Sequence, residues 1–203
     1  MGGRWAAEAN GDIHVHYRVN TENPRPNTEL TTAQIVRAID SAAASWMAAD
    51  PKVHLVDDGL SQELPSQTGP GNNVIGFTSE GVSFSTLPAP DAHGYYPGFS
   101  MSLTNTVTWR PCDPAHNDPC SPYVSSVSSI DLQDVATHEF GHVLGLGHPP
   151  HDTTDERLSM YGNTANSTCG ADCRWADTLG LGDVLGLRAL YPTSAPMPVI
   201  YDD

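Results

Sequence analysis

The sequence predicts an α+β fold in which helices cover a twisted, mixed β-sheet. The first half of the chain holds one long segment with a helical apolar period, and short alternating segments lie before and after it. A second helical segment with a strong apolar period follows these predicted strands, and a third lies near the end of the chain. With 203 residues, the chain is long enough to bury one sizeable core.

The first predicted elements are a strand, a helix and a second strand. Apolar and polar residues alternate along residues 12–19, so the apolar side chains share one face of a predicted strand. His14 and His16 lie on the other face. These two histidines could form a metal pair, but the simpler interpretation is a solvent-facing strand surface. Thr31 or Thr32 is expected to cap the helix, which ends at Asp50 before a proline. Residues 53–56 form the second predicted strand.

Three further strands are expected at residues 74–77, 82–87 and 99–109. In the last of these, apolar residues recur at every second position. Residues 128–131 then fit a capping box before the most regular helical pattern of the chain, which Gly145 and Gly147 end. Residues 179–191 form the closing helix.

Composition excludes several classes of function. The formal net charge is −15, from 24 acidic and 9 basic residues, so the chain repels phosphate backbones and we expect no nucleic-acid partner. No apolar run approaches the roughly 20 residues that a membrane span needs. The first residues lack the apolar segment of a signal peptide. The chain is therefore either intracellular or a mature form that has lost its leader.

The four cysteines form two close pairs along the chain: Cys112 with Cys120, and Cys169 with Cys173. Three disulfide connectivities are possible, and we favour the local one because it closes the shortest loops. A four-cysteine zinc site is the alternative, although neither pair has the two-residue spacer typical of such sites. Two disulfides would require an oxidising compartment, so we expect a secreted protein.

The strongest chemical signal lies on the second helical segment. His138 and His142 are four residues apart, so both imidazoles project from one helical face and can reach one zinc ion. Glu139 is offset in angle and can hold a metal-bound water without ligating the metal. Gly145 can adopt a positive φ and turn the chain, which would deliver His148 as the third ligand. Three histidine ligands leave a fourth position open, as in catalytic zinc sites.

The string HEFGHVLGLGH at residues 138–148 resembles the elongated zinc signature of the metzincin metallopeptidases, and its filler residues most resemble the matrixin branch. Residues 158–161, LSMY, are similar to the Met-turn of that clan, which implies that Met160 forms a hydrophobic floor beneath the zinc. The resemblance also implies that the following stretch, beginning with Tyr161 and Gly162, builds the main specificity pocket. The second cysteine pair lies in that stretch, where a disulfide would stiffen the pocket wall.

The resemblance implies one metallopeptidase catalytic domain, residues 1–203, of metzincin (zincin-like) fold. Its upper subdomain would be residues 1–147, with the active-site helix, and its lower subdomain residues 148–203, with the Met-turn and the closing helix. We expect a monomer whose protein or peptide substrates lie extended along the edge strand at residues 82–87. Asp183 is expected to pair with the region of the active-site helix.

The chain departs from the matrixin pattern before the active-site helix. The cluster that would hold a structural zinc is reduced to Asp91, His93 and His116, so we do not expect that zinc. Calcium stays open as a second ion, because backbone carbonyls and carboxylates could bind it. The candidate carboxylates are Asp57, Asp58, Asp113 and Asp118.

These patterns predict a zinc-dependent endopeptidase. The zinc would lower the pKa of its water, and Glu139 would take the proton and later deliver it to the leaving amine. Two alternatives remain: a zinc-binding interaction module without catalysis, and a zinc amidase acting on cell-wall or other non-protein substrates.

Overall fold

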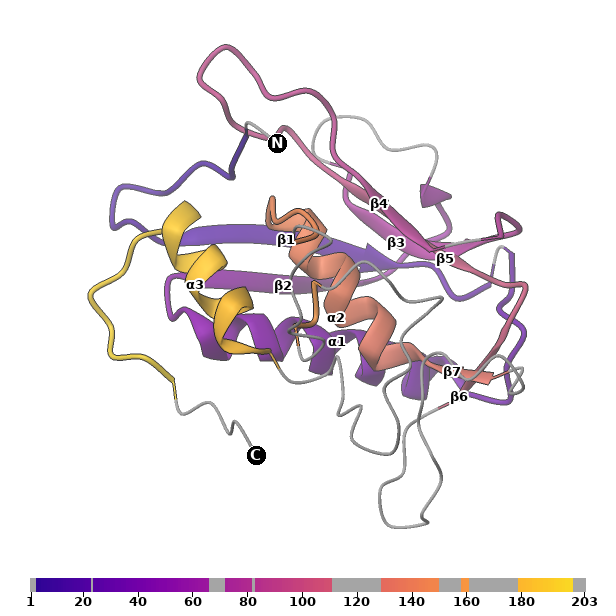
Figure 1. Cartoon of the computed structure of the whole chain (residues 1–203). Coiled ribbons are helices and arrows are strands. Elements are labelled where there is room, and N and C mark those ends of the chain that lie inside the picture. Colours follow the sequence, from indigo (N-terminus) through magenta and orange to yellow (C-terminus); the bar gives the residue numbers. More distant parts are fainter. Residues whose placement is uncertain are drawn as a thin grey trace.

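The computed structural model describes residues 3–22, 24–65, 72–81, 83–110, 129–149, 158–160 and 179–198. In these ranges the element order is β1, α1, β2 to β7, α2 and α3, and Figure 1 shows their arrangement. The predicted α+β class, a mixed sheet covered by helices, is confirmed.

The main sheet has five strands in the order β2-β1-β3-β5-β4. Parallel pairing joins the first four in this order, and β4 pairs antiparallel with β5 at the edge. The bounds are β1 Ile13–Val19, β2 Val53–Leu60, β3 Val74–Thr78, β4 Phe84–Thr86 and β5 Ser100–Thr104. The predicted edge strand at residues 82–87 therefore exists as the three residues of β4, and Val82 lies outside the described residues.

The predicted alternation of β1 is confirmed, since its odd-numbered residues are buried and His14 and His16 are exposed. Strand β2 is longer than predicted. Between Tyr17 and Val19 of β1 the pairing shifts from Asp57 to Leu60, so β2 carries one extra residue. Gly59 lies in this β-bulge with φ of 95°, a conformation that glycine adopts without strain. The bulge lets an acidic, turn-like sequence continue the strand.

The predicted single strand at residues 99–109 is wrong. Strand β5 ends at Thr104, and β6 (Thr108–Arg110) pairs instead with β7 (Ser129–Asp131) in a separate two-stranded sheet. The Thr104 hydroxyl accepts the backbone N–H of Thr106, and the Trp109 indole donates to the Thr104 carbonyl at 2.8 Å. These local bonds replace the strand ladder and turn the chain out of the sheet.

Helix α1 (Thr32–Ala49) begins as predicted. Thr31 is its N-cap, and Thr31 and Gln34 form a capping box in which each side chain binds the other residue's backbone N–H. The helix ends at Asp50, as the Asp-Pro pair indicated.

Helix α2 (Leu132–Val143) begins later than the sequence indicated. Residues 129–131 form β7, and Asp131 is itself the N-cap, accepting the N–H groups of Gln133 and Asp134. The predicted capping box at residues 128–131 is therefore wrong, because Asp131 is the N-cap and pairing with β6 holds residues 129–131 extended.

Helices α1 and α2 cover the same face of the main sheet (Figure 1). Tyr17 of β1 demonstrates this, because its ring packs edge to face with Phe140 of α2 and its hydroxyl donates to Asp40 of α1. The two helices are joined directly by Trp46, whose indole N–H donates to the Thr137 carbonyl at 2.8 Å. The core therefore lies between the sheet and the helix that carries the histidine motif.

The closing helix α3 (Leu181–Leu190) holds the segment at residues 158–160. The buried carboxylate of Asp183 accepts the N–H groups of Ser159, Met160 and Gly180 at 2.7, 3.2 and 3.0 Å. These bonds satisfy the charge and fix the backbone of the predicted Met-turn. In the part of the chain that the structure describes, no helix is long and apolar enough to span a membrane.

Gly141 of α2 lies where a side chain would collide with the core. A Cβ atom added there would lie 2.0 Å from the Met160 sulfur and 2.8 Å from a ring carbon of Trp46. Both neighbours are buried, so the added methyl group would force them apart.

We expect Gly141→Ala to lower the free energy of unfolding by about 1–3 kcal/mol, the usual range for overpacking, despite the better helix propensity of alanine. Thermal unfolding measures this effect. Gly81→Ala is the control, because a Cβ atom added at Gly81 would meet no atom within 4 Å, so this variant should unfold like the unmodified protein. If both variants had the same stability, the expected collision between a Cβ atom at residue 141 and the Met160 sulfur would be contradicted.

Candidate metal centre

His138 and His142 lie one turn apart on α2, as the sequence predicted. Their ring centroids are 4.7 Å apart and the ring planes are nearly perpendicular. The helix that presents them is fixed on the sheet side by Phe140, which is fully buried and lies between them in sequence. The two imidazoles therefore project from a rigid surface.

The helix ends in a Schellman motif that brings the third histidine back. Gly145 has φ of 96°, its N–H donates to the His142 carbonyl, and the Leu146 N–H donates to the Gly141 carbonyl, both at 2.9 Å. The chain then reverses, and the Nε2 atom of His148 lies 3.1 Å from the Nε2 atoms of both His138 and His142. Gly145 ends the helix as predicted, whereas Gly147 has no positive φ.

Hydrogen bonds to the outer ring nitrogens orient two of the imidazoles. The Nδ1 atom of His138 lies 2.5 Å from the Ser159 carbonyl oxygen, and Nδ1 of His142 lies 2.9 Å from the Leu146 carbonyl oxygen. A carbonyl oxygen can only accept, so Nδ1 carries the proton in both rings and Nε2 carries a lone pair. This is the arrangement found around metal-bound histidines.

The three nitrogen atoms fit a tetrahedral divalent ion. Zinc bonds of about 2.0–2.1 Å would separate two nitrogen ligands by roughly 3.3 Å, close to the observed separations. Among the described residues, these histidines are the one group of three or more metal-binding side chains that converge.

Burial keeps the first two imidazoles neutral. It lowers the pKa of His138 to about 4, with smaller contributions in the same direction from His142 and His148, against the opposing bond with Ser159. Burial also lowers the pKa of His142, and the bond with Leu146 opposes this. Neutral rings at pH 7 are the form that binds a metal.

Glu139 follows the first histidine but points into the protein. Its side chain is buried, and its Oε2 atom has no hydrogen-bond partner among the described residues. Burial raises the pKa of Glu139 to about 7, and hydrogen bonding from Ser85 opposes the rise. A buried carboxyl group with an unused oxygen beside three convergent imidazoles is suited to proton transfer, and a nearby cation would favour its ionised form.

Met160 and Asp183 support the site from the side of α3. Met160 is buried against Gly141, and Asp183 holds the backbone of residues 159 and 160, whose Ser159 carbonyl binds His138. Asp183 thus binds the turn that contacts His138, and its pairing with the active-site helix itself stays a prediction.

Several predicted residues lie outside the described ranges. These are the pocket candidates Tyr161 and Gly162, the cysteines Cys112, Cys120, Cys169 and Cys173, and the metal candidates Asp113, His116 and Asp118.

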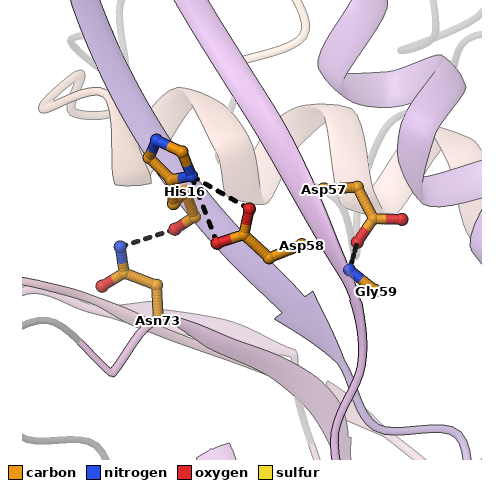
Figure 2. Close-up of polar contacts among 5 residues, drawn as sticks. All are labelled: His16, Asp57, Asp58, Gly59 and Asn73. Atoms are coloured by element: carbon orange, nitrogen blue, oxygen red, sulfur yellow. Dashed lines mark hydrogen bonds and ion pairs between the residues drawn. The ribbon is translucent and has the colours of Figure 1, made fainter.

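The described calcium candidates do not converge. Figure 2 shows Asp58 turned toward His16, whose Nδ1 lies 3.0 Å from an Asp58 oxygen, whereas Asp57 lies apart and accepts the Gly59 N–H. Strand geometry explains this, because successive side chains of β2 point to opposite faces. His14 stacks on His54, with ring centroids 4.5 Å apart, whereas His16 contacts Asp58. Asp91 accepts backbone N–H groups of His93 and Tyr95 in a local turn.

Sequence reasoning missed three contacts that orient the site. The carbonyl groups of Leu146 and Ser159 bind histidines, and backbone carbonyls leave no signal in a sequence. Ser85 of β4 donates to the Glu139 carbonyl at 3.1 Å, although it lies 54 residues away in a segment without a motif.

Known proteins share sequence similarity with most of this chain. The Matrixin family model matches residues 4–191. The chain is 30% identical over 164 residues to the metalloendoproteinase 1-MMP of Arabidopsis thaliana, covering 80% of this chain and 39% of that protein. It is 27% identical over 191 residues to human neutrophil collagenase, covering 91% of this chain and 35% of the relative. The chain thus spans little more than a third of the length of these relatives.

Solved structures that resemble this chain include high choriolytic enzyme 1, a hatching-enzyme zinc protease of the medaka Oryzias latipes. It is 14% identical, with a TM-score of 0.47, over 93% of this chain and 94% of that one. Myroilysin is 13% identical, with a TM-score of 0.47, over 94% and 86%. The Matrixin model spans nearly the whole chain and includes the three convergent histidines, so this chain belongs to the matrixin family of metallopeptidases.

Proposed function

We propose that this chain is a zinc-dependent endopeptidase in which His138, His142 and His148 hold the metal and Glu139 is the general base. The observation that supports it best is the convergence of three Nε2 atoms beside a buried glutamate with an unused oxygen. A fixed structural zinc site would be closed by a fourth protein ligand, whereas three ligands leave a position for the reacting groups.

Strand β4 is suited to bind an extended substrate. It is the terminal strand of the five-stranded sheet, and its residue Ser85 contacts α2 at Glu139. A peptide that pairs with the outer edge of β4, which is the terminal strand of the sheet among the described residues, would lie across the histidine site. Its backbone hydrogen bonds would supply affinity for many sequences. Met160 would form the floor under the metal, and Tyr161 and Gly162 would begin the wall of the specificity pocket.

The chain's own groups would perform the proton transfers. When bound, zinc supplies Lewis-acid polarisation of the scissile carbonyl and lowers the pKa of the attacking water. The Glu139 carboxylate accepts a proton from that water as it attacks the carbonyl carbon. It then donates the proton to the nitrogen of the leaving amine as the C–N bond breaks. The carbonyls of Ser159 and Leu146 keep two histidine ligands in one tautomer throughout.

Further parts of the proposal rest on the sequence and the family. We infer a secreted monomer with disulfides Cys112–Cys120 and Cys169–Cys173, and a boundary between upper and lower subdomains at residues 147 and 148. Calcium remains a candidate second ion.

Hydrolysis of unstructured casein tests the proposal. The purified chain should cleave casein, a chelator should abolish cleavage, and added zinc should restore it, with one zinc per chain by elemental analysis. Tight zinc binding without cleavage of any peptide would contradict the proposal and favour the non-catalytic binding module. Cleavage of cell-wall amides but not of casein would favour the amidase.

Glu139→Ala should lower kcat by at least about 100-fold, because general acid–base catalysis contributes about 10²–10⁴. Zinc content should stay at that of the unmodified protein, since this side chain is not a ligand. Exposed Glu29 provides the matched control, and Glu29→Ala should leave kcat unchanged. Retained hydrolysis in Glu139→Ala would exclude its role as general base.

His148→Ala should weaken zinc binding by more than about 100-fold, since loss of even an outer contact to a ligand costs 10–100-fold. Competition with a chromogenic chelator measures the zinc Kd. His16→Ala removes an exposed histidine of β1 and should leave this Kd unchanged. If the two variants bound zinc equally well, His148 would not be a ligand.

A further inference from the structure

Ser85 joins the edge of the sheet to the active-site helix. The β4 side chains alternate, so Phe84 and Thr86 are exposed while Ser85 turns inward, opposite the buried Met101 of β5. Its hydroxyl donates to the Glu139 carbonyl oxygen at 3.1 Å. A short edge strand is thereby fixed to one residue of α2, and that residue carries the proposed general base.

The same serine also lies close to the side chain of Glu139. Hydrogen bonding from Ser85 opposes the rise that burial causes in the pKa of this carboxyl group. The second carboxyl oxygen, Oε2, has no partner among the described residues and is left for the reaction. Strand β4 therefore holds the backbone of Glu139 while Oε2 is available.

On the opposite side, the helix is held by a different bond. The Trp46 indole donates to the carbonyl of Thr137, two residues before Glu139. This bond fixes α2 against α1 but contributes nothing to the spacing between α2 and β4. In the described part of the chain, Ser85 provides the hydrogen bond from β4 that sets this spacing.

We propose that Ser85 is a positioning residue whose hydroxyl sets the distance and orientation of Glu139 relative to a substrate paired with β4. The inference rests on the proposed endopeptidase function. Strand β4 would fix the substrate backbone, so the position of the scissile carbonyl is defined relative to β4. Glu139 belongs to another element, and a bond between the two is needed to keep its carboxylate within proton-transfer reach.

This role predicts a selective kinetic effect. Substrate pairing uses the β4 backbone, which Ser85→Ala leaves intact, so KM should change little. Glu139 loses the bond that fixes its backbone to β4, so its carboxylate is held less well for proton transfer. We therefore expect kcat to fall about fivefold to tenfold, as for loss of one neutral hydrogen bond. Zinc affinity should stay unchanged, because the histidines are untouched. The unfolding temperature should fall only by the about 2–4 °C that loss of one hydrogen bond costs in a domain of this size, as in Ser45→Ala.

The experiment compares Ser85→Ala, Ser85→Thr and Ser45→Ala with the unmodified chain. A fluorogenic peptide that the unmodified chain cleaves reports kcat and KM, chelator competition reports the zinc Kd, and thermal unfolding reports stability. Threonine keeps the hydroxyl and suits a strand, so Ser85→Thr should recover most of kcat. Ser45 is the matched control, because its hydroxyl also donates to a backbone carbonyl, that of Ser41 in α1.

The inference is supported if Ser85→Ala lowers kcat without a change in KM or zinc affinity and threonine restores it. It is overturned if kcat of Ser85→Ala equals that of the unmodified chain. It is also overturned if the loss comes with a raised KM, weaker zinc binding or an unfolding temperature well below that of Ser45→Ala, which indicate a general structural role. Failure of the unmodified chain to cleave any peptide would instead refute the proposed function, so the two failures are distinguishable.

Discussion

The reversal of the chain at Gly145 is the constraint on which the histidine site depends. A helix can align His138 and His142 on one face. A continued helix would carry His148 away from the position where these two imidazoles converge. The positive φ of Gly145 permits the Schellman motif, and its two hydrogen bonds end α2 and return the chain with His148. The same turn presents the Leu146 carbonyl to Nδ1 of His142. One local feature therefore ends the helix, delivers a third imidazole and sets the tautomer of the second.

The rest of the structure holds α2 so that this turn has a fixed position. Trp46 reaches the helix from α1 and Ser85 reaches it from β4, and each donates a side-chain hydrogen bond to a carbonyl beside a site residue. At its end, the indole of Trp5 donates to the Val143 carbonyl and the hydroxyl of Tyr191 to that of Leu144. Carbonyl groups in the last turn lack partners within the helix, so these two bonds satisfy groups that would otherwise be buried unpaired. The distant ends of the chain thus stabilise the point where the helix stops.

Burial lowers the pKa of one site residue and raises the pKa of another, because it disfavours the charged form of each. It disfavours charge on His138 and so keeps its imidazole neutral, and it disfavours charge on Glu139 and so raises the pKa of its carboxyl group toward neutrality. The buried carboxyl group of Asp183 differs from that of Glu139, because it accepts hydrogen bonds from three backbone N–H groups. That difference separates a carboxyl group available for proton transfer from one that fixes the backbone under His138.

The sequence by itself determined the parts that depend on local spacing: the two histidines one turn apart, the glycine turn before the third, the Thr31 cap and the alternation of β1. Only the tertiary structure decided where residues 99–109 divide into β5 and β6, why Asp131 rather than an earlier residue begins α2, and how β2 continues through its bulge. It also decided which carbonyls orient the histidines and that Ser85 contacts Glu139. Those features depend on pairing between segments far apart in the chain and on backbone groups that every residue carries, so the order of side chains does not encode them locally.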